Sequence, residues 1–122
     1  MGNAQTRAIA EDYLGRMSRG DFDGCVELLS PKQFRYVGPT VQFDKAIDYL
    51  ADISRVGGIL KGARIRRMVV EENEAFVAFD VLTTLEELAC TRVAQWMRVH
   101  DGRIVEIEVF FDARAYAMLF AG

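Results

Sequence analysis

The chain divides into two parts by the spacing of its apolar residues. Before Ile59, apolar side chains recur mostly every three or four residues, which is the period of a helix with one buried face. From Ile59 onward, apolar and polar side chains alternate, as they do in a strand with one buried face. The pattern predicts three N-terminal helices followed by a meander of long strands, an α+β fold in which a curved antiparallel sheet wraps over the helices.

Capping residues, glycines and prolines set the limits of the elements in the first part of the chain. Gly20 ends the first helix, Asp21 precedes the second, and Gly38-Pro39 ends a short strand. The predicted elements are helices over Ala4–Arg19 and Phe22–Ser30, a strand over Gln33–Val37, and a third helix from the cap candidate Asp44 to Gly57-Gly58.

The most regular alternation belongs to a hairpin from Cys90 to Asp112 around the turn His100-Asp101-Gly102. An Asp-Gly pair tolerates the positive φ angles that tight hairpin turns require. One face of this hairpin is apolar except for a single amide; it comprises Val93, Gln95, Met97, Val99, Val105, Ile107, Val109 and Phe111. We expect that face to look onto a core or a cavity. The other predicted elements are strands over Lys61–Glu71 and Ala75–Leu85 and a final helical turn over Ala113–Phe120.

The opposite face of the hairpin mixes charged and large apolar side chains, namely Arg92, Trp96, Arg98, Ile104, Glu106, Glu108 and Phe110. Aromatic and arginine side chains on an exposed sheet face are typical of a protein interface. We therefore expect a homodimer that forms through the sheet face around Trp96. The alternative is an ordinary solvated face with weak cross-strand ion pairs.

The length and the balance of apolar and charged residues are those of one globular domain, spanning residues 1–122. The net charge of −3 and the lack of a basic stripe argue against nucleic-acid binding. The sequence has no apolar run of membrane-helix length and no hydrophobic signal core, so we expect a cytoplasmic protein that does not bind a membrane. Cys25 and Cys90 are expected to be buried free thiols, and a single histidine with scattered acids predicts no metal site and no other cofactor.

Several local sequences match one protein family: Tyr13-Leu14, Gly20-Asp21-Phe22-Asp23-Gly24, Leu28-Leu29-Ser30-Pro31, and the last hairpin from Trp96-Met97-Arg98-Val99 through Gly102-Arg103-Ile104-Val105 to Phe110-Phe111-Asp112. Over nearly its whole length, the chain resembles the nuclear-transport-factor-2-like (NTF2-like) superfamily in its SnoaL-like and steroid Δ5-isomerase branch. The resemblance implies a cone of curved sheet and helices around an apolar pocket (a cystatin-like roll), commonly in a homodimer. It does not define a function, because this fold hosts isomerases, dehydratases, epoxide hydrolases, cyclases and non-catalytic binders.

The resemblance also implies roles for single residues. Tyr13 matches a tyrosine that donates a hydrogen bond to the reacting oxygen, and Gln95 stands at the second donor position, which in the family is a protonated aspartic acid. The position of the family's general base is Val37, which cannot accept a proton and counts strongly against steroid-type isomerisation. Asp112 is the best remaining carboxylate for a cyclase-type base, with the capping of a terminal helix as its alternative role.

The residue pattern and the resemblance together predict a pocket that binds a small lipophilic or aromatic molecule, for isomerisation, cyclisation, hydrolysis or binding alone. The candidate catalytic residues are Tyr13, Gln95 and Asp112, and the candidate ligand-binding residues are Met17, Tyr36, Val37, Phe79, Val93, Met97, Ile107 and Phe111. One alternative is a filled core, in which Tyr13 and Gln95 bond to each other or in which Met17, Phe34, Phe43 and Met97 occupy the space. Another is a non-catalytic dimeric module that acts through its exposed sheet face.

Overall fold

The computed structural model describes residues 2–86 and 89–114. The elements in these ranges are the helices α1 (Asn3–Ser18), α2 (Phe22–Glu27) and α3 (Ala46–Val56), the 3-10 turn η1 (Gly57–Ile59), and the strands β1 (Arg35–Val37), β2 (Gln42–Phe43), β3 (Leu60–Glu71), β4 (Glu74–Thr83), β5 (Cys90–His100) and β6 (Arg103–Phe110). The predicted helical turn over Ala113–Phe120 lies almost wholly outside the described residues.

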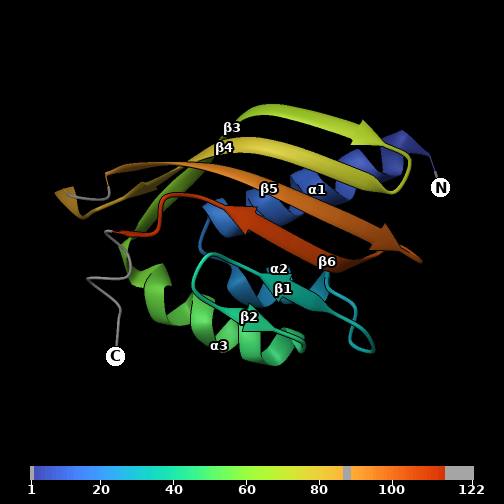
Figure 1. Cartoon of the computed structure of the whole chain (residues 1–122), viewed down its shortest axis with the longest axis horizontal. Helices are drawn as coiled ribbons and strands as arrows, with labels where there is room; N and C mark the ends of the chain where they lie inside the picture. The colour runs from blue at the N-terminus through green and yellow to red at the C-terminus, as the bar shows by residue number, and fades with distance from the viewer. Residues whose placement is uncertain (1, 87–88, 115–122) are drawn as a thin grey trace.

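The described strands form one sheet in the order β2-β1-β6-β5-β4-β3. Figure 1 shows this sheet curving over the helices, with α1 beneath the long strands and α3 beneath β1 and β2. Helix α1 contacts β3 and β4, whereas α3 contacts β2 and α2. The predicted α+β fold, a curved sheet wrapped over N-terminal helices, is confirmed.

One strand pairing differs from the prediction of a purely antiparallel sheet. Strand β1 lies parallel to β6, with Tyr36 opposite Ile107 and Val37 opposite Glu108. On its other side β1 pairs with β2 in the antiparallel sense, with Tyr36 opposite Phe43. A strand of two residues is too short to show an alternating pattern, so β2 was not predicted. The parallel pair joins parts of the chain far apart in sequence, which local patterns do not reveal.

The central hairpin has the predicted turn but contains an irregularity that the alternation did not predict. Asp101 and Gly102 have φ angles of 50° and 76°, as a tight hairpin turn requires. The register shifts so that Arg98 pairs with Glu106 but Val99 pairs with Ile104, and the extra residue, Val105, forms a β-bulge. Ile104 is therefore fully buried, and its predicted place on the outer face is wrong.

Two helix limits and one burial prediction are also wrong. Helix α2 ends at Glu27 rather than Ser30, because the chain from Leu28 to Ser30 turns to exchange backbone hydrogen bonds with Ile104, at 2.8 and 2.9 Å. The N-cap of α3 is Lys45 and not Asp44, and no side chain caps that helix. Cys25 is buried as expected, whereas Cys90 is exposed; both are free thiols.

The core lies between the inner face of the sheet and the helices. Its most deeply buried side chains come from α1, from α2 and the segment after it, and from the long strands; they include Tyr13, Leu14, Cys25, Leu29, Val77, Met97, Val99, Ile104 and Ile107. No helix in the described ranges is long and apolar enough to cross a membrane. The expected cytoplasmic location stays a prediction.

Candidate functional site

A cavity of about 370 Å³ lies beside this core. Most of its lining residues come from three parts of the fold. The inner face of the sheet contributes Phe79, Val81, Thr91, Val93, Gln95 and Val109; α3 contributes Tyr49, Asp52, Ile53 and Arg55; β1 and the loop after it contribute Tyr36, Gly38, Pro39, Thr40 and Val41; and Met17 and Phe111 complete the lining. The inner face of the central strands therefore looks partly onto a core and partly onto a cavity.

Gln95 is the most unusual side chain in this cavity. It lies on β5 between Val77 of β4 and Val109 of β6, so that strand alternation turns it inward. Only 3% of its surface is exposed, and its buried Nε2 has no hydrogen-bond partner among the described residues. A buried amide without a partner costs roughly 1–3 kcal/mol, so an unsatisfied donor of this kind indicates a position for a ligand or a water molecule.

Three tyrosines connect the cavity to the core. The Tyr13 and Tyr49 hydroxyl groups form a hydrogen bond with each other, and the Tyr49 ring stacks on Tyr36 with 4.3 Å between ring centres. Tyr49 and Tyr36 line the cavity, whereas Tyr13 is fully buried behind Tyr49. Burial is the main cause that raises the pKa of all three phenols above the ordinary value. They are therefore neutral near pH 7 and can donate hydrogen bonds but not act as bases.

Asp52 and Arg55 form an ion pair in the wall that α3 contributes. Asp52 Oδ1 lies 3.2 Å from Arg55 Nη2, and the Asp52 side chain is 24% exposed. Tyr49, Asp52 and Ile53 are spaced by three and four residues, so they share one helix face that turns toward the cavity. This face was not among the predicted site residues, although the predicted third helix contains the spacing.

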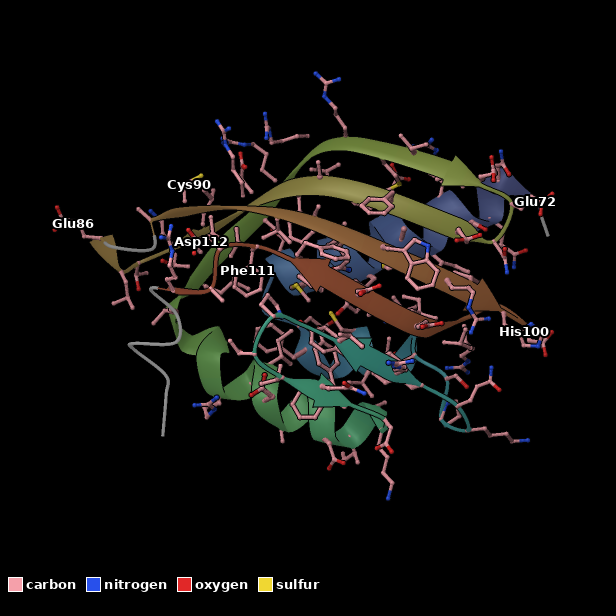
Figure 2. The ribbon with its side chains drawn as sticks, in the orientation of Figure 1. Glu72, Glu86, Cys90, His100, Phe111 and Asp112 are labelled. Carbon is pink, nitrogen blue, oxygen red and sulfur yellow. The ribbon has the colours of Figure 1, made fainter. Side chains whose placement is uncertain are left out.

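Asp112 lies at the end of the sheet that carries Cys90, opposite the end with Glu72 and His100, as Figure 2 shows. Its neighbour Phe111 lines the cavity, but Asp112 does not. The Asp112 carboxylate accepts hydrogen bonds from the Arg114 Nε at 2.9 Å and from the Arg114 backbone N–H at 3.2 Å. These bonds lower the pKa of Asp112 to about 2, which makes this exposed carboxylate a weak base. A carboxylate that accepts a backbone N–H two residues further on is typical of a capping side chain and not of a catalytic base. Most of the segment that Asp112 would cap lies outside the described residues.

The structure brings most of the predicted pocket residues together. Met17, Tyr36, Phe79, Val93, Gln95 and Phe111 all line the cavity. Five others do not: Met97 and Ile107 are fully buried in the core, Tyr13 reaches the cavity only through Tyr49, Val37 lies on the other face of β1 from Tyr36, and Asp112 is exposed and bound to Arg114. The filled-core alternative in which Tyr13 and Gln95 bond to each other is wrong, because Tyr13 pairs with Tyr49.

The polar groups in the cavity suit a neutral organic ligand with an oxygen atom. The site offers one free amide donor, phenol and threonine hydroxyl groups, and the paired Asp52 carboxylate and Arg55 guanidinium, within largely apolar walls. The described residues contain no group of three or more His, Cys, Asp or Glu side chains that could hold a metal ion.

Solved structures with the same arrangement of helices and strands identify the fold. An NTF2-like protein of unknown function from Cytophaga hutchinsonii superposes with a TM-score of 0.77 at 18% identity, covering 91% of this chain and 93% of that one. A candidate ketosteroid isomerase from Kribbella flavida gives a TM-score of 0.75 at 20% identity, with coverage of 90% and 79%. A candidate polyketide cyclase from Sinorhizobium meliloti gives 0.75 at 17% identity, with coverage of 84% and 94%. The chain thus has the NTF2-like fold.

Residues 10–107 match the family model of the SnoaL-like domain. The chain belongs to the SnoaL-like domain family. No curated protein matches it.

Proposed function

We propose that this chain binds a small lipophilic or aromatic molecule in its cavity, with an oxygen atom of the ligand accepting a hydrogen bond from Gln95 Nε2. The observation that carries this proposal is the buried, unpartnered amide in the cavity wall. A ligand oxygen in that position would satisfy the donor and recover the free energy that its burial costs.

The size and the walls of the cavity support the same ligand class. A volume of about 370 Å³ falls within the roughly 300–1,000 Å³ of small-molecule sites. Phe79, Val93 and Val109 offer apolar contacts, and the Tyr36 ring offers an aromatic face. Because the walls are largely apolar and the donors few, a flat molecule with one or two oxygen atoms would match better than a highly charged one.

The second part of the proposal is that the chain catalyses a reaction of the bound ligand. Relatives in this fold include proteins named as a candidate ketosteroid isomerase and a candidate polyketide cyclase. Both kinds of reaction develop negative charge on a carbonyl oxygen, which a positioned hydrogen-bond donor stabilises. We propose an isomerase, cyclase or hydrolase activity in which Gln95 polarises the oxygen and the neutral Tyr49 hydroxyl, paired with Tyr13, is a second donor.

Calorimetric titration with two probes of nearly equal shape tests the binding proposal. 2-Tetralone carries a ketone oxygen on a saturated ring that is fused to a benzene ring, and tetralin is the same ring system without the oxygen. We expect 2-tetralone to bind roughly tenfold more tightly than tetralin, because one hydrogen bond to an otherwise unsatisfied donor contributes about 1–3 kcal/mol. Equal affinities, or no binding of either probe, would contradict the proposal.

A second candidate function, a dimeric binding or scaffold module, is favoured by the outer face of the sheet. The Phe76 and Phe110 rings are each 47% exposed and stack on that face with 6.4 Å between ring centres. Phe76 on β4 lies opposite Val69 on β3, which is 68% exposed, and opposite Trp96 on β5. Exposed apolar groups gathered in this way are typical of an interaction surface.

Charges at the two ends of this apolar patch favour a second copy of the chain as the partner. One end is mainly acidic, with the cross-strand row Glu71, Glu74, Arg98 and Glu106. The other end is mainly basic, with Arg64, Arg92 and the neighbouring Arg66 around Asp80. A two-fold axis through the patch would place the acidic row of each copy over the basic cluster of the other, which is the self-complementarity that such a dimer needs.

Sedimentation equilibrium tests the dimer. We expect the wild-type chain to sediment at about twice its monomer mass of 13.8 kDa and Phe110→Arg to sediment as the monomer. The matched control is Ile47→Arg, because Ile47 is also exposed but lies on α3. A wild-type monomer at high protein concentration would refute the dimer. Retained binding of 2-tetralone by Phe110→Arg would show that the pocket and the interface act independently.

A further inference from the structure

The outer face of the sheet carries a buried carboxylate, Asp80. Strand alternation turns Asp80 outward from β4, away from the neighbouring Phe79, which lines the cavity. Only 5% of its surface is exposed. Its Oδ2 accepts a hydrogen bond from Arg64 Nη2 at 2.9 Å, whereas its buried Oδ1 has no partner among the described residues. Because buried carboxylate oxygens normally accept hydrogen bonds, Oδ1 marks a position for a further donor.

Three arginines surround this carboxylate. Arg64 on β3 and Arg92 on β5 lie directly opposite Asp80 in the two neighbouring strands. Arg66 stands where the register between β3 and β4 shifts, and its charge also acts on Asp80. The hydrogen bond from Arg64 and the positive charges of Arg66 and Arg92 lower the pKa of Asp80. The carboxylate is therefore ionised near pH 7, where it accepts hydrogen bonds and cannot donate them.

The cluster has an excess of two positive charges, because three guanidinium groups face one carboxylate. Figure 2 shows side chains that end in nitrogen gathered on the outside of β3 and β4, at the end of the sheet that carries Cys90. All three arginines are exposed, the Arg64 side chain by 65%. Within the described ranges, Arg66 and Arg92 have no hydrogen-bond partner, so their N–H groups are available to an oxyanion. Long exposed side chains can also reorient around a small ligand and open the way to Asp80 Oδ1.

A carboxylate at the centre of a basic cluster selects among anions. Sulfate carries no proton near pH 7, so each of its oxygens would repel Asp80 Oδ1. Hydrogen phosphate has the same charge and the same tetrahedral shape, but it also has one P–O–H group that can donate a hydrogen bond to Oδ1. This type of ligand matches both the excess of positive charge and the acceptor that lacks a donor.

We propose that this cluster is a binding site for a phosphoryl dianion that keeps one proton, with free hydrogen phosphate as its ligand. The three arginines donate hydrogen bonds to the phosphate oxygens, and Asp80 Oδ1 accepts one from the P–O–H group. The site lies on the opposite face of the sheet from the cavity, so it does not depend on any ligand there. The proposed dimer would place its acidic row over the same arginines, and hydrogen phosphate would compete with that contact.

Titration of ¹⁵N-labelled protein at pH 8 and constant ionic strength, followed by the backbone amide shifts of Asp80 and Arg92, tests the site. The three probes are inorganic phosphate, sulfate and methyl phosphate. At this pH inorganic phosphate keeps one proton, whereas sulfate has none and methyl phosphate, with a second pKa of about 6, has lost nearly all of its own. We expect inorganic phosphate to bind about tenfold more tightly than either of the others, because it alone donates to Asp80.

Two results of this titration would overturn the proposal. Amide shifts that do not respond to inorganic phosphate would exclude the site. Equal affinities for the three anions, or a preference for methyl phosphate, would show that the proton is not recognised, and a phosphoryl group on a larger molecule would then be the better ligand.

The variant Asp80→Asn tests the role of the carboxylate. Removing its negative charge should make sulfate bind more tightly than it binds to the wild type, and the preference for phosphate should be lost. If Asp80 served only to hold Arg64 in place, its loss would weaken the binding of both anions. Unchanged discrimination between phosphate and sulfate by Asp80→Asn would contradict the proposal.

A pair of arginine variants separates a defined site from general charge attraction. Arg92→Gln should weaken phosphate binding about tenfold, because a charge-assisted hydrogen bond is lost. Arg67→Gln is the matched control: Arg67 is also an exposed arginine of β3, but it is not among the charges that lower the pKa of Asp80. Its affinity for phosphate should stay within about threefold of the wild type. Equal losses in the two variants would contradict a site at Asp80.

Phosphate binding and dimer formation can be tested apart. Phe76→Ser removes a half-exposed ring from the apolar patch without adding a charge near the cluster. It should weaken the proposed dimer and leave phosphate binding at least as tight as in the wild type. Loss of phosphate binding in Phe76→Ser would contradict its assignment to the arginine cluster, whereas a wild-type chain that is a monomer and binds phosphate would refute the dimer alone.

Discussion

Replacing Gln95 by methionine should make the protein more stable and a poorer binder of ketones. Methionine is also unbranched and of similar size, so it can occupy the same space on β5 without the buried amide. Removing a donor that has no partner among the described residues should raise the free energy of unfolding by about 1–2 kcal/mol. The same change should weaken 2-tetralone binding roughly tenfold, because the ketone oxygen loses its donor.

Urea denaturation and calorimetric titration measure the two effects on the same preparations. Gln33→Met is the matched control, because Gln33 is exposed and lies outside the cavity, so both quantities should stay near the wild-type values. A Gln95→Met variant that is less stable than wild type would mean that the amide has a partner in the folded protein. An unchanged affinity for 2-tetralone would mean that Gln95 does not bind the ligand.

The free energy of unfolding should fall more when Tyr49 loses its hydroxyl group than when Tyr13 does. Tyr49→Phe leaves the fully buried Tyr13 hydroxyl without its partner, which should lower the free energy of unfolding by about 1–3 kcal/mol. Tyr13→Phe should cost less, because the Tyr49 hydroxyl remains beside the cavity, where water can replace the lost bond. The double variant should be more stable than Tyr49→Phe alone, because it leaves no stranded hydroxyl group.

A double-mutant cycle in urea measures these differences, with Tyr36→Phe as the control. Tyr36 also lines the cavity and stacks on Tyr49, but its hydroxyl group does not take part in the Tyr13–Tyr49 bond. Losses that simply add in the double variant would show that the two hydroxyl groups do not depend on each other for stability.

The sequence predicts the site most accurately in the central hairpin, where apolar and polar residues alternate most regularly. Alternation in the central hairpin places Gln95 inward among apolar residues, and the Asp101-Gly102 pair predicts the turn that sets the register. The same alternation fails at Ile104, because the bulge at Val105 reverses the order of inner and outer positions between the turn and the bulge. A bulge of this kind leaves no clear signal in a single apolar run such as Ile104-Val105.

The contacts between distant elements could not be predicted from the residues alone. The parallel pairing of β1 with β6 decides that Tyr36 faces the cavity and Val37 does not. The bond between Tyr13 and Tyr49 depends on how α1 and α3 meet beneath the sheet, and so does the place of Asp52 in the cavity wall. The helical spacing groups Tyr49 with Asp52, but only the folded arrangement shows that their shared face lines a cavity and not a filled core.

The side-chain amide of Gln95 gives the most direct test of the account. In ¹⁵N-labelled protein, the two Gln95 NH₂ proton resonances can be assigned by their loss in Gln95→Met and then followed during titration with 2-tetralone. We predict a downfield shift of one of these protons that saturates with the binding curve, and no such shift with tetralin. Gln95 resonances that stay unchanged while 2-tetralone binds would contradict the claim that this amide holds the ligand oxygen.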